Sequence, residues 1–173
     1  RASTATSGIS SGHSSRAAEC AMVKMPLLYK TDGTDGSNGE TIEIFIKRLR
    51  KSSAKAHKAL WMLQGGPGAP STAMEVLLEA AYVEQNGEMD VYTFDHRGTG
   101  RSSPMSCVAS QTLTTNSQSG TSLGYEEVGH CFAAFNDGFK TPNAQHGFSV
   151  TMAAHDLHRA IELFNTEQET IVY

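Results

Sequence analysis

The 173-residue sequence predicts an α/β fold in which a mainly parallel sheet carries helices on both faces and begins with an antiparallel hairpin. Two observations carry this prediction. Apolar strand-like segments alternate with amphipathic helix-like segments over most of the chain, which is typical of parallel sheets. Two earlier strand-like segments are separated by a cluster of Gly, Asp and Asn, which is typical of a hairpin turn. The length is that of one domain with its own core.

The hairpin should be formed by two strands near the start of the chain. The segment "AMVKMPLLY" (21–29) is apolar and contains Pro26, which suits an edge strand. The segment 30–40 is the turn, and in "TIEIFIKRLRK" (41–51) three isoleucines alternate with residues of the opposite face. This alternation predicts a strand that is buried on one face.

The alternating strands and helices follow the hairpin. The continuous apolar run 59–64 predicts a strand covered on both faces. Behind it, Met74 to Tyr82 show helical spacing, with Ser71 or Thr72 as N-cap and Asn86-Gly87 as the end. The remaining elements are a strand at 89–95, a short helix at 125–137, an amphipathic helix at 149–165 and a buried strand at 169–173.

The first residues differ in composition from the rest of the chain. Residues 1–16 contain eight Ser or Thr and a single large aliphatic residue, Ile9. Such a segment cannot bury enough apolar surface to offset its ordering entropy, so residues 1–19 are predicted to be a flexible tail. Part of a transit peptide is the alternative interpretation. Because the chain begins with Arg1, we expect an upstream segment.

The charge of the chain bears on its partners. It has 14 Lys and Arg against 18 Asp and Glu, a formal net charge of −4, and no long run of one sign. We therefore expect no nucleic-acid partner and no attraction to an anionic membrane. We also expect no membrane insertion, because no apolar stretch approaches the length needed to span a bilayer.

Two glycine-rich segments, 65–68 and 98–100, follow predicted strands at their carboxyl ends, where ligands bind in parallel sheets. The first has neither the lysine of a phosphate loop nor the spacing of a dinucleotide fingerprint. Arg97 and Arg101 could bind a phosphate, or could pair with a neighbouring aspartate. The remaining interpretation is an oxyanion hole, in which a glycine N–H points at a developing negative charge.

Other candidate sites are weaker. His155 and His158 lie three residues apart on one predicted helix, but no further ligands accompany them, so no metal site is predicted. Ser102 and Ser103 follow a glycine turn, but no base is placed to activate them. Cys107 and Cys131 flank a loop rich in Ser, Thr and Gly and are predicted to form a disulfide, with two unrelated thiols as the alternative.

Three motifs carry a resemblance to a known family. "QGGPG" (64–68), "DHRGTGRS" (95–102) and "AAHDLHRAIE" (153–162) followed by "ETIVY" resemble the α/β-hydrolase fold. More narrowly, they resemble the serine peptidases of the proline iminopeptidase and tripeptidyl aminopeptidase family. The resemblance rests on the order and spacing of the motifs. It implies that residues 20–173 are the N-terminal part of an α/β-hydrolase catalytic domain, truncated before the nucleophile elbow.

The resemblance implies two sets of site residues. The catalytic set is the oxyanion-hole loop, Gly65 and Gly66, in which the Gly66 N–H donates to the oxyanion. The site-shaping set is Gln64, Pro67, Gly68, Asp95 and Arg97. Gln64 stands where the family has histidine. Because glutamine also donates and accepts hydrogen bonds, we expect the loop to survive this change.

The function implied by the resemblance is that of a serine hydrolase of the aminopeptidase type, which cuts peptides by acyl transfer without a cofactor. No G-x-S-x-G occurs in the chain, so the Ser-Asp-His triad has no counterpart in it, and the fragment alone is expected to be inactive. A carboxylesterase for small esters and a non-catalytic member are the alternatives. The predicted disulfide, together with the likeness of "CAMVKMPLLY" after Cys20 to secreted members, predicts an extracellular protein.

Overall fold

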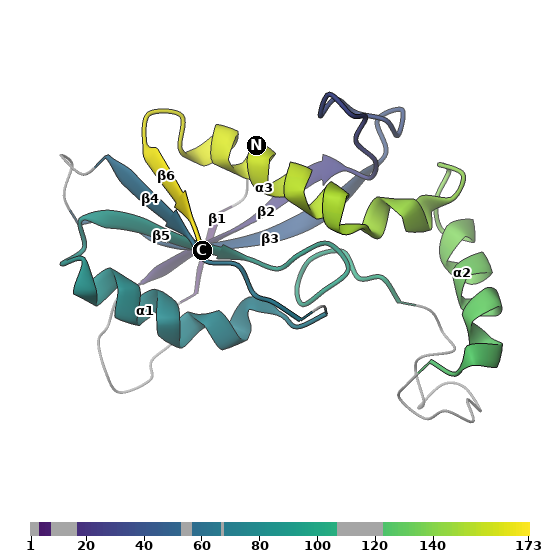
Figure 1. The fold of residues 1–173 in the computed structure, drawn as a ribbon, viewed down its shortest axis with the longest axis horizontal. Coiled ribbons are helices and arrows are strands. Elements are labelled where there is room, and N and C mark those ends of the chain that lie inside the picture. The colour runs from purple at the N-terminus through teal and green to yellow at the C-terminus, as the bar shows by residue number, and fades with distance from the viewer. Residues whose placement is uncertain (1–3, 8–16, 53–56, 67, 107–122) are drawn as a thin grey trace.

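The computed structural model describes residues 4–7, 17–52, 57–66, 68–106 and 123–173. Over these residues it is a sheet in the strand order β1-β2-β3-β5-β4-β6, with helices on both faces, as the sequence predicted (Figure 1). The strands are β1 (Thr4–Ser7), β2 (Ala18–Pro26), β3 (Thr41–Leu49), β4 (Lys58–Trp61), β5 (Met89–Phe94) and β6 (Glu169–Val172). The helices are α1 (Glu75–Glu84), α2 (Val128–Asp137) and α3 (Val150–Phe164), and the 3-10 turns are η1 (Ser71–Met74), η3 (Tyr125–Glu127) and η4 (Ala144–Phe148).

The sheet is mixed, which corrects the prediction of a mainly parallel one. β2 is antiparallel to both β1 and β3, and β3 is antiparallel to β5, whereas β4 is parallel to β5 and β6. The predicted β2–β3 hairpin is confirmed. β5 is buried at every position. A strand of this kind has the same apolar pattern whether its neighbours run with it or against it, so the sequence could not reveal the direction of β3.

β1 lies within the segment predicted to be a flexible tail. Thr4 pairs with Ala21 and Ser7 with Ala18, and β2 itself begins at Ala18. The prediction of a tail over 1–19 is therefore corrected for residues 4–7 and 18–19. Pairing along the edge of β2 uses backbone hydrogen bonds, so it does not require the apolar pattern by which a buried strand is predicted from sequence.

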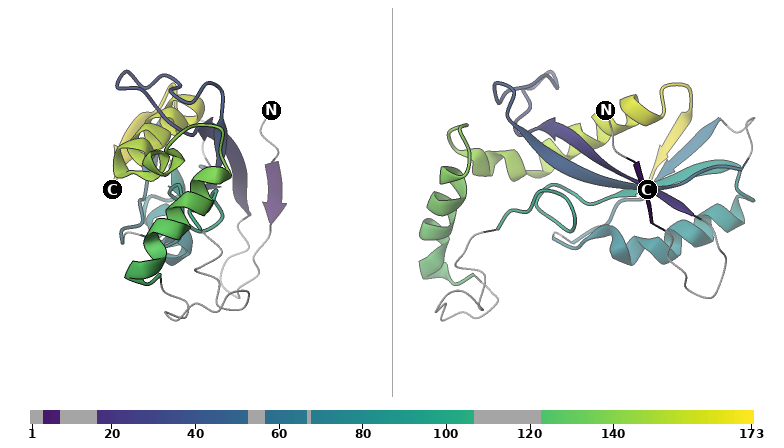
Figure 2. Two further views of the ribbon diagram at one scale, coloured as in Figure 1. Left: turned by 90° about the vertical axis from the view of Figure 1, so that its right-hand side faces the viewer. Right: turned by 180° about the vertical axis from the view of Figure 1, so that it is seen from behind.

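α3 lies over one face of the sheet and α1 over the other (Figures 1 and 2), and each face has its own core. The core under α3 contains Trp61 and Tyr92, whose rings stack with centroids 4.5 Å apart, and the Trp61 Nε1–H donates to Asn165 at 2.8 Å. The core under α1 contains Leu78 and Val91. Because β4 and β5 are covered on both faces, their carboxyl ends are held firmly in place.

The observed ends of α1 match the ends predicted from the sequence only in part. The helix is followed by Asn86 and Gly87 with φ of 51° and 70°, so its predicted end is confirmed. Its N-cap is Met74, and the short turn η1 precedes it, so neither Ser71 nor Thr72 is the N-cap of α1. The turn inserts one tight 3-10 segment between the glycine-rich loop and the helix.

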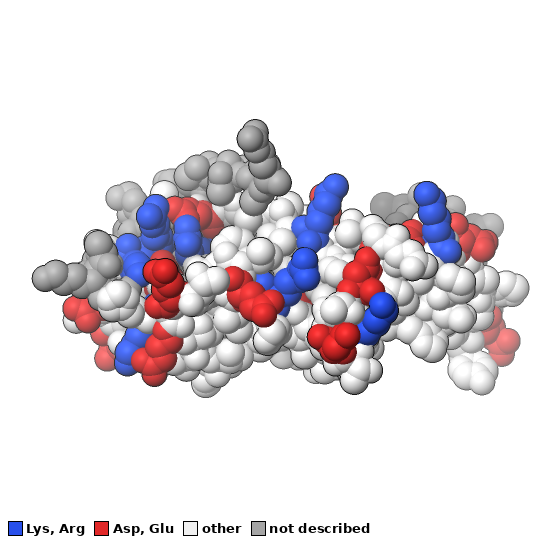
Figure 3. Space-filling view, turned by 90° about the horizontal axis from the view of Figure 1, so that it is seen from above, with Lys and Arg blue, Asp and Glu red and all other residues white. Residues whose placement is uncertain are grey.

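The surface carries mixed charge. On the face shown in Figure 3, Lys and Arg are interspersed with Asp and Glu. This pattern agrees with the modest net charge of −4. In the described part of the chain, no helix combines the length and apolar character needed to cross a bilayer.

Candidate functional site

The two glycine-rich segments lie side by side at the carboxyl ends of β4 and β5. β4 and β5 are parallel, and their pairing ends at Trp61 opposite Tyr92, so the residues after both strands emerge side by side (Figure 1). We call residues 64–71 the glycine loop and residues 95–103 the Asp95 turn. Of the predicted site residues in the glycine loop, Pro67 lies outside the described residues.

Gly66 has a backbone conformation that requires glycine. Its φ is 149°, and a Cβ at this position would come within 2.9 Å of the Gly68 nitrogen. The loop therefore folds back on itself at a point where no side chain fits. Gly65 and Gly66 are exposed, and the Gly66 N–H donates no hydrogen bond to any described residue.

The two ends of the glycine loop are held by consecutive residues of the Asp95 turn. At one end, the Nε2 of His96 lies 3.1 Å from the carbonyl oxygen of Gln64. At the other end, the N–H of Ser71 donates to Oδ1 of the fully buried Asp95 at 2.6 Å. We call this pair of contacts the clamp. It anchors the loop ends, while the glycines between them face solvent.

Asp95 is enclosed by hydrogen-bond donors. Its Oδ2 accepts the N–H of Arg101 at 2.8 Å and lies 3.2 Å from the Arg101 Nε. A Cβ on Gly100 would lie 2.4 Å from this oxygen, so only glycine fits beside the carboxylate. Burial alone raises the pKa of Asp95, but the hydrogen bonds from Arg101 and Ser71 outweigh it and hold that pKa below its usual value.

Arg97 points away from the glycine loop and into the protein. Its guanidinium is 1% exposed. Nε and Nη2 donate to Asp156 at 2.7 and 2.6 Å, Nη1 donates to the carbonyls of Leu27 and Gly147, and Nη2 also donates to the carbonyl of Pro26. All five N–H donors of the side chain are used. Arg97 therefore fixes the Asp95 turn to α3, η4 and the end of β2, and has no donor left for a phosphate.

Ser102 and Ser103 attach the same turn to β3. The Ser102 hydroxyl donates to the Asp95 carbonyl at 2.6 Å and accepts the N–H of Phe45 at 2.9 Å, and the Ser103 hydroxyl accepts the N–H of Glu43 at 2.9 Å. The sequence did not reveal this role. Both hydroxyls complete the backbone hydrogen bonding of β3 beyond its pairing with β5.

The candidate metal and thiol sites are placed as follows. His155 stacks on Tyr29 with ring centroids 5.0 Å apart, and His158 lies 3.8 Å from Glu162. Among the described residues, no group of three His, Cys, Asp or Glu side chains is placed to hold a metal ion. Cys107 lies outside the described residues, so its disulfide with Cys131 of α2 stays a prediction. Cys20 on β2 is a free thiol.

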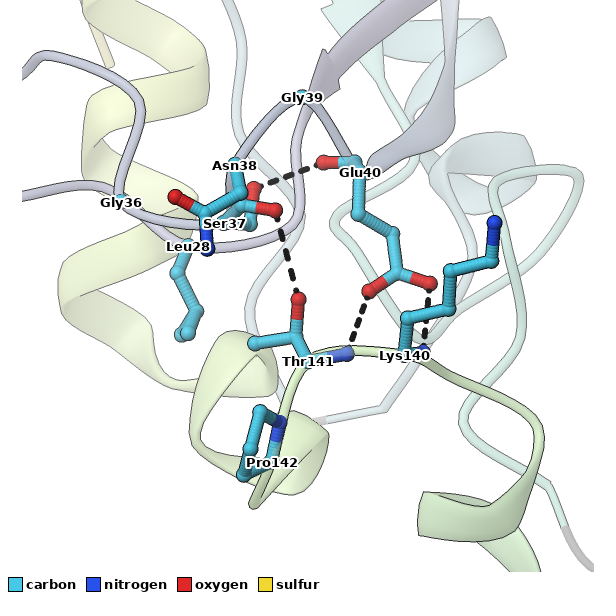
Figure 4. Close-up of a pocket in the computed structure, with 9 residues that line it drawn as sticks. All are labelled: Leu28, Gly36, Ser37, Asn38, Gly39, Glu40, Lys140, Thr141 and Pro142. Carbon is cyan, nitrogen blue, oxygen red and sulfur yellow. Dashed lines mark hydrogen bonds between the residues drawn. The ribbon is translucent and has the colours of Figure 1, made fainter.

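A hollow of about 540 Å³ lies between the β2–β3 turn and residues 140–142 (Figure 4). Several polar groups of its wall pair with each other. The Glu40 carboxylate accepts the N–H groups of Lys140 and Thr141 at 2.9 and 2.8 Å, and the Thr141 hydroxyl donates to the Ser37 carbonyl at 3.4 Å. These bonds join the hairpin to the segment before η4, and no residue of the glycine loop lines the hollow.

No protein-family model and no curated protein matches this chain. Among solved structures, it is similar to a cold-adapted esterase from an Arctic intertidal metagenomic library, with a TM-score of 0.44 and 9% identity, over 90% of this chain and 49% of that one. It is also similar to a prohormone-processing carboxypeptidase from Saccharomyces cerevisiae, with a TM-score of 0.42 and 12% identity, over 89% of this chain and 30% of that one. The chain thus spans about half of the esterase and under a third of the carboxypeptidase. At this level of similarity neither structure identifies the site, which rests on the residues themselves.

The sequence correctly placed the glycine loop and Asp95 at the carboxyl ends of strands, but it did not predict the contact that His96 makes. No local signal could have identified this residue, because its partner Gln64 is 32 positions away. The resemblance implied that Arg97 braces the turn that walls the site. Its contacts lie on the protein side of the turn, where it supports the residues that hold the loop.

Proposed function

We propose that this chain forms the oxyanion-loop part of an α/β-hydrolase that acts as a serine hydrolase, with an aminopeptidase-type peptidase as the favoured activity. The observation that carries the proposal is the exposed N–H of Gly66, which has no hydrogen-bond partner among the described residues and lies on a loop whose two ends are anchored. In acyl transfer, the substrate carbonyl oxygen becomes anionic. A preorganised N–H donor then stabilises the transition state by roughly 3 kcal/mol.

The proposed mechanism needs groups outside these 173 residues. The serine of a nucleophile elbow, an acid and a histidine would form and resolve the acyl-enzyme, and the N–H after the serine would be the second oxyanion donor. The glycine loop would supply the first donor through Gly66. In this proposal the intact enzyme needs no cofactor and acts on peptides outside the cell.

The choice of a peptidase rests on the order of the three motifs, "QGGPG", "DHRGTGRS" and "AAHDLHRAIE". An esterase for small esters uses the same oxyanion chemistry and is the second candidate, because the proposed donor would contact only the carbonyl oxygen that amides and esters share. A non-catalytic protein that keeps the loop is the third.

The test uses the natural full-length protein. A G-x-S-x-G downstream of Tyr173, with hydrolysis of aminoacyl-arylamides, supports the peptidase, whereas cleavage of short p-nitrophenyl esters alone supports the esterase. Gly66→Ala should lower kcat about 100-fold with little change in KM, because the added Cβ displaces the loop and moves the N–H away from the oxyanion that it stabilises in the transition state. Gly129→Ala is the control, since a Cβ there meets no atom within 4 Å.

The proposal would be overturned by a downstream sequence without a nucleophile elbow, or by hydrolysis of neither substrate class. Full activity of Gly66→Ala would refute the role of this N–H even in an active enzyme. The change at Gly66 should move the loop, because the added Cβ would lie 2.9 Å from the Gly68 nitrogen.

A further inference from the structure

We propose that Asp95 and His96 are positioning residues that hold the Gly66 N–H where its acceptor will lie; the inference rests on the function proposed above. The two side chains are adjacent in sequence, and each makes a hydrogen-bond contact with one end of the glycine loop. Neither touches the reacting atoms. They act by limiting where the loop can place its donor.

The glycine loop needs such a restraint because few hydrogen bonds among the described residues of the loop itself limit its conformation. Gly66 has no hydrogen bond from its N–H to a described residue, and glycine has the largest conformational freedom of any residue. A donor that moves must be ordered again at each turnover, and this ordering raises the barrier. Anchoring both Gln64 and Ser71 shortens the free segment to the glycines and their immediate neighbours.

The anchor at Ser71 requires a carboxylate. Asp95 accepts the N–H of Ser71 with one oxygen, and the N–H and Nε–H of Arg101 with the other. An asparagine would keep the shape of this side chain but would present an NH2 group, a donor, to one of these partners. Asp95→Asn must therefore lose either the anchor to the loop or the contact with Arg101.

The anchor at Gln64 requires an N–H on the His96 ring. A carbonyl oxygen only accepts, so Nε2 must carry the proton in this contact. The ring also packs edge-on against Phe94, with centroids 4.6 Å apart, and no described residue is hydrogen-bonded to its Nδ1. His96→Phe keeps an aromatic ring against Phe94 but removes the donor to Gln64, so it separates packing from anchoring.

The turn that bears the clamp is itself fixed. Arg97 uses all its donors on Asp156 and three carbonyls, and the Ser102 hydroxyl joins the turn to β3. Because these bonds lie on the opposite side of the turn from the loop, changes at Asp95 or His96 should loosen the loop without detaching the turn.

The chain offers a matched control at the other end of β5. Asp90 is also buried, at 4% exposure, and also accepts a backbone N–H, that of Lys51, with one oxygen and a side-chain donor, Gln168 Nε2, with the other. Asp90→Asn makes the same chemical change at the opposite end of β5, far from the glycine loop. It should lower global stability without altering the loop.

The experiment measures hydrogen–deuterium exchange by mass spectrometry, together with kcat and KM, in the natural full-length protein and in Asp95→Asn, His96→Phe and Asp90→Asn. Peptides covering residues 62–74 should exchange about tenfold faster in the first two variants than in the unchanged protein. His96→Phe loses the hydrogen bond to Gln64, and Asp95→Asn loses either the hydrogen bond from Ser71 or the Arg101 contact that holds the side chain in place. In an active enzyme, kcat should fall about tenfold or more at nearly constant KM. Asp90→Asn should leave loop exchange and kcat unchanged.

Exchange and activity keep the two proposals apart. Unchanged exchange of residues 62–74 in both Asp95→Asn and His96→Phe would overturn the clamp, whether or not the protein hydrolyses anything. Faster exchange with kcat unchanged in an active enzyme would overturn the positioning role. Faster exchange in a protein that cleaves neither amides nor esters would leave the clamp standing and refute the hydrolase. If Asp95→Asn fails to fold, the result for His96→Phe decides.

Discussion

Asp95, at the scale of single residues, shows how a buried carboxylate can be held charged by its surroundings. Its side chain is fully buried, and such burial disfavours the charged form. Two backbone N–H groups and the Arg101 guanidinium compensate, and Gly100 leaves the room that these contacts need. The carboxylate thereby links two loops that follow different strands.

This linkage predicts a pH dependence of stability. The pKa of Asp95 is lower in the folded protein than its usual value of about 3.9. Its contribution to the free energy of unfolding is therefore complete above about pH 4 and is lost as pH falls further, through the lowered pKa. The stability difference between the unchanged protein and Asp95→Asn should be constant from pH 7 to 5 and shrink below pH 4.

Urea unfolding at several pH values measures this difference. The shrinkage has a structural reason, because a protonated carboxyl, like an asparagine amide, presents a donor where Ser71 and Arg101 both require an acceptor. A difference that stays the same down to pH 3 would show that the charge of Asp95 does not stabilise the fold.

At the scale of elements, the sheet edges differ in their protection. β1 covers one side of β2 through backbone pairing. At the other edge, β6 pairs with β4, and within the described residues no strand covers its second side. Ile171 and Val172 are 40% and 48% exposed there. An exposed apolar edge strand can pair with another chain.

We therefore expect the isolated 173-residue chain to associate in solution. Ile171→Lys should reduce this association, because a charge on an edge strand opposes pairing with a second copy. Size-exclusion chromatography with light scattering measures the mass. Val76→Lys is the control, since Val76 is 77% exposed on α1, away from the edge. A monodisperse monomer of the unchanged chain, or equal rescue by both variants, would contradict the prediction.

At the scale of the whole molecule, one buried ion pair joins segments that are distant in sequence. Arg97 and Asp156 are 1% and 0% exposed, and the arginine also binds the carbonyls that end β2 and lie in η4. The Tyr29 hydroxyl donates to the same aspartate at 2.9 Å. α3, the Asp95 turn and the hairpin are thus fixed relative to each other at this point.

Arg97→Met should lower the free energy of unfolding by about 3–5 kcal/mol, because it leaves a buried carboxylate and three carbonyls without their donor. The midpoint of urea unfolding at pH 7 measures the loss. Lys58→Met is the control, since its pair with Glu169 is more than half exposed and should contribute at most about 1 kcal/mol. A loss of less than 1 kcal/mol for Arg97→Met would refute the structural role of the pair.

Much of this fold was accessible from local patterns. The three isoleucines of β3, the continuous apolar run of β4 and the helical spacing of α1 and α3 predicted these elements near their observed bounds. The same reasoning placed both glycine segments at the carboxyl ends of strands. It missed β1, because edge pairing through the backbone leaves no apolar signature in a segment of Ser, Thr and Ala.

The sequence by itself determined the alternation of strands and helices and the positions of the glycines, because side-chain periodicity and backbone freedom are properties of neighbouring residues. Only the tertiary structure decided that β3 is antiparallel to β5. It also decided that His96 contacts Gln64, that Asp95 is hydrogen-bonded to Ser71, and that Arg97 pairs with Asp156. These contacts join residues 32, 24 and 59 positions apart. These contacts form only when the folded sheet brings the ends of its strands together. A short stretch of sequence cannot reveal which distant residues will then be neighbours.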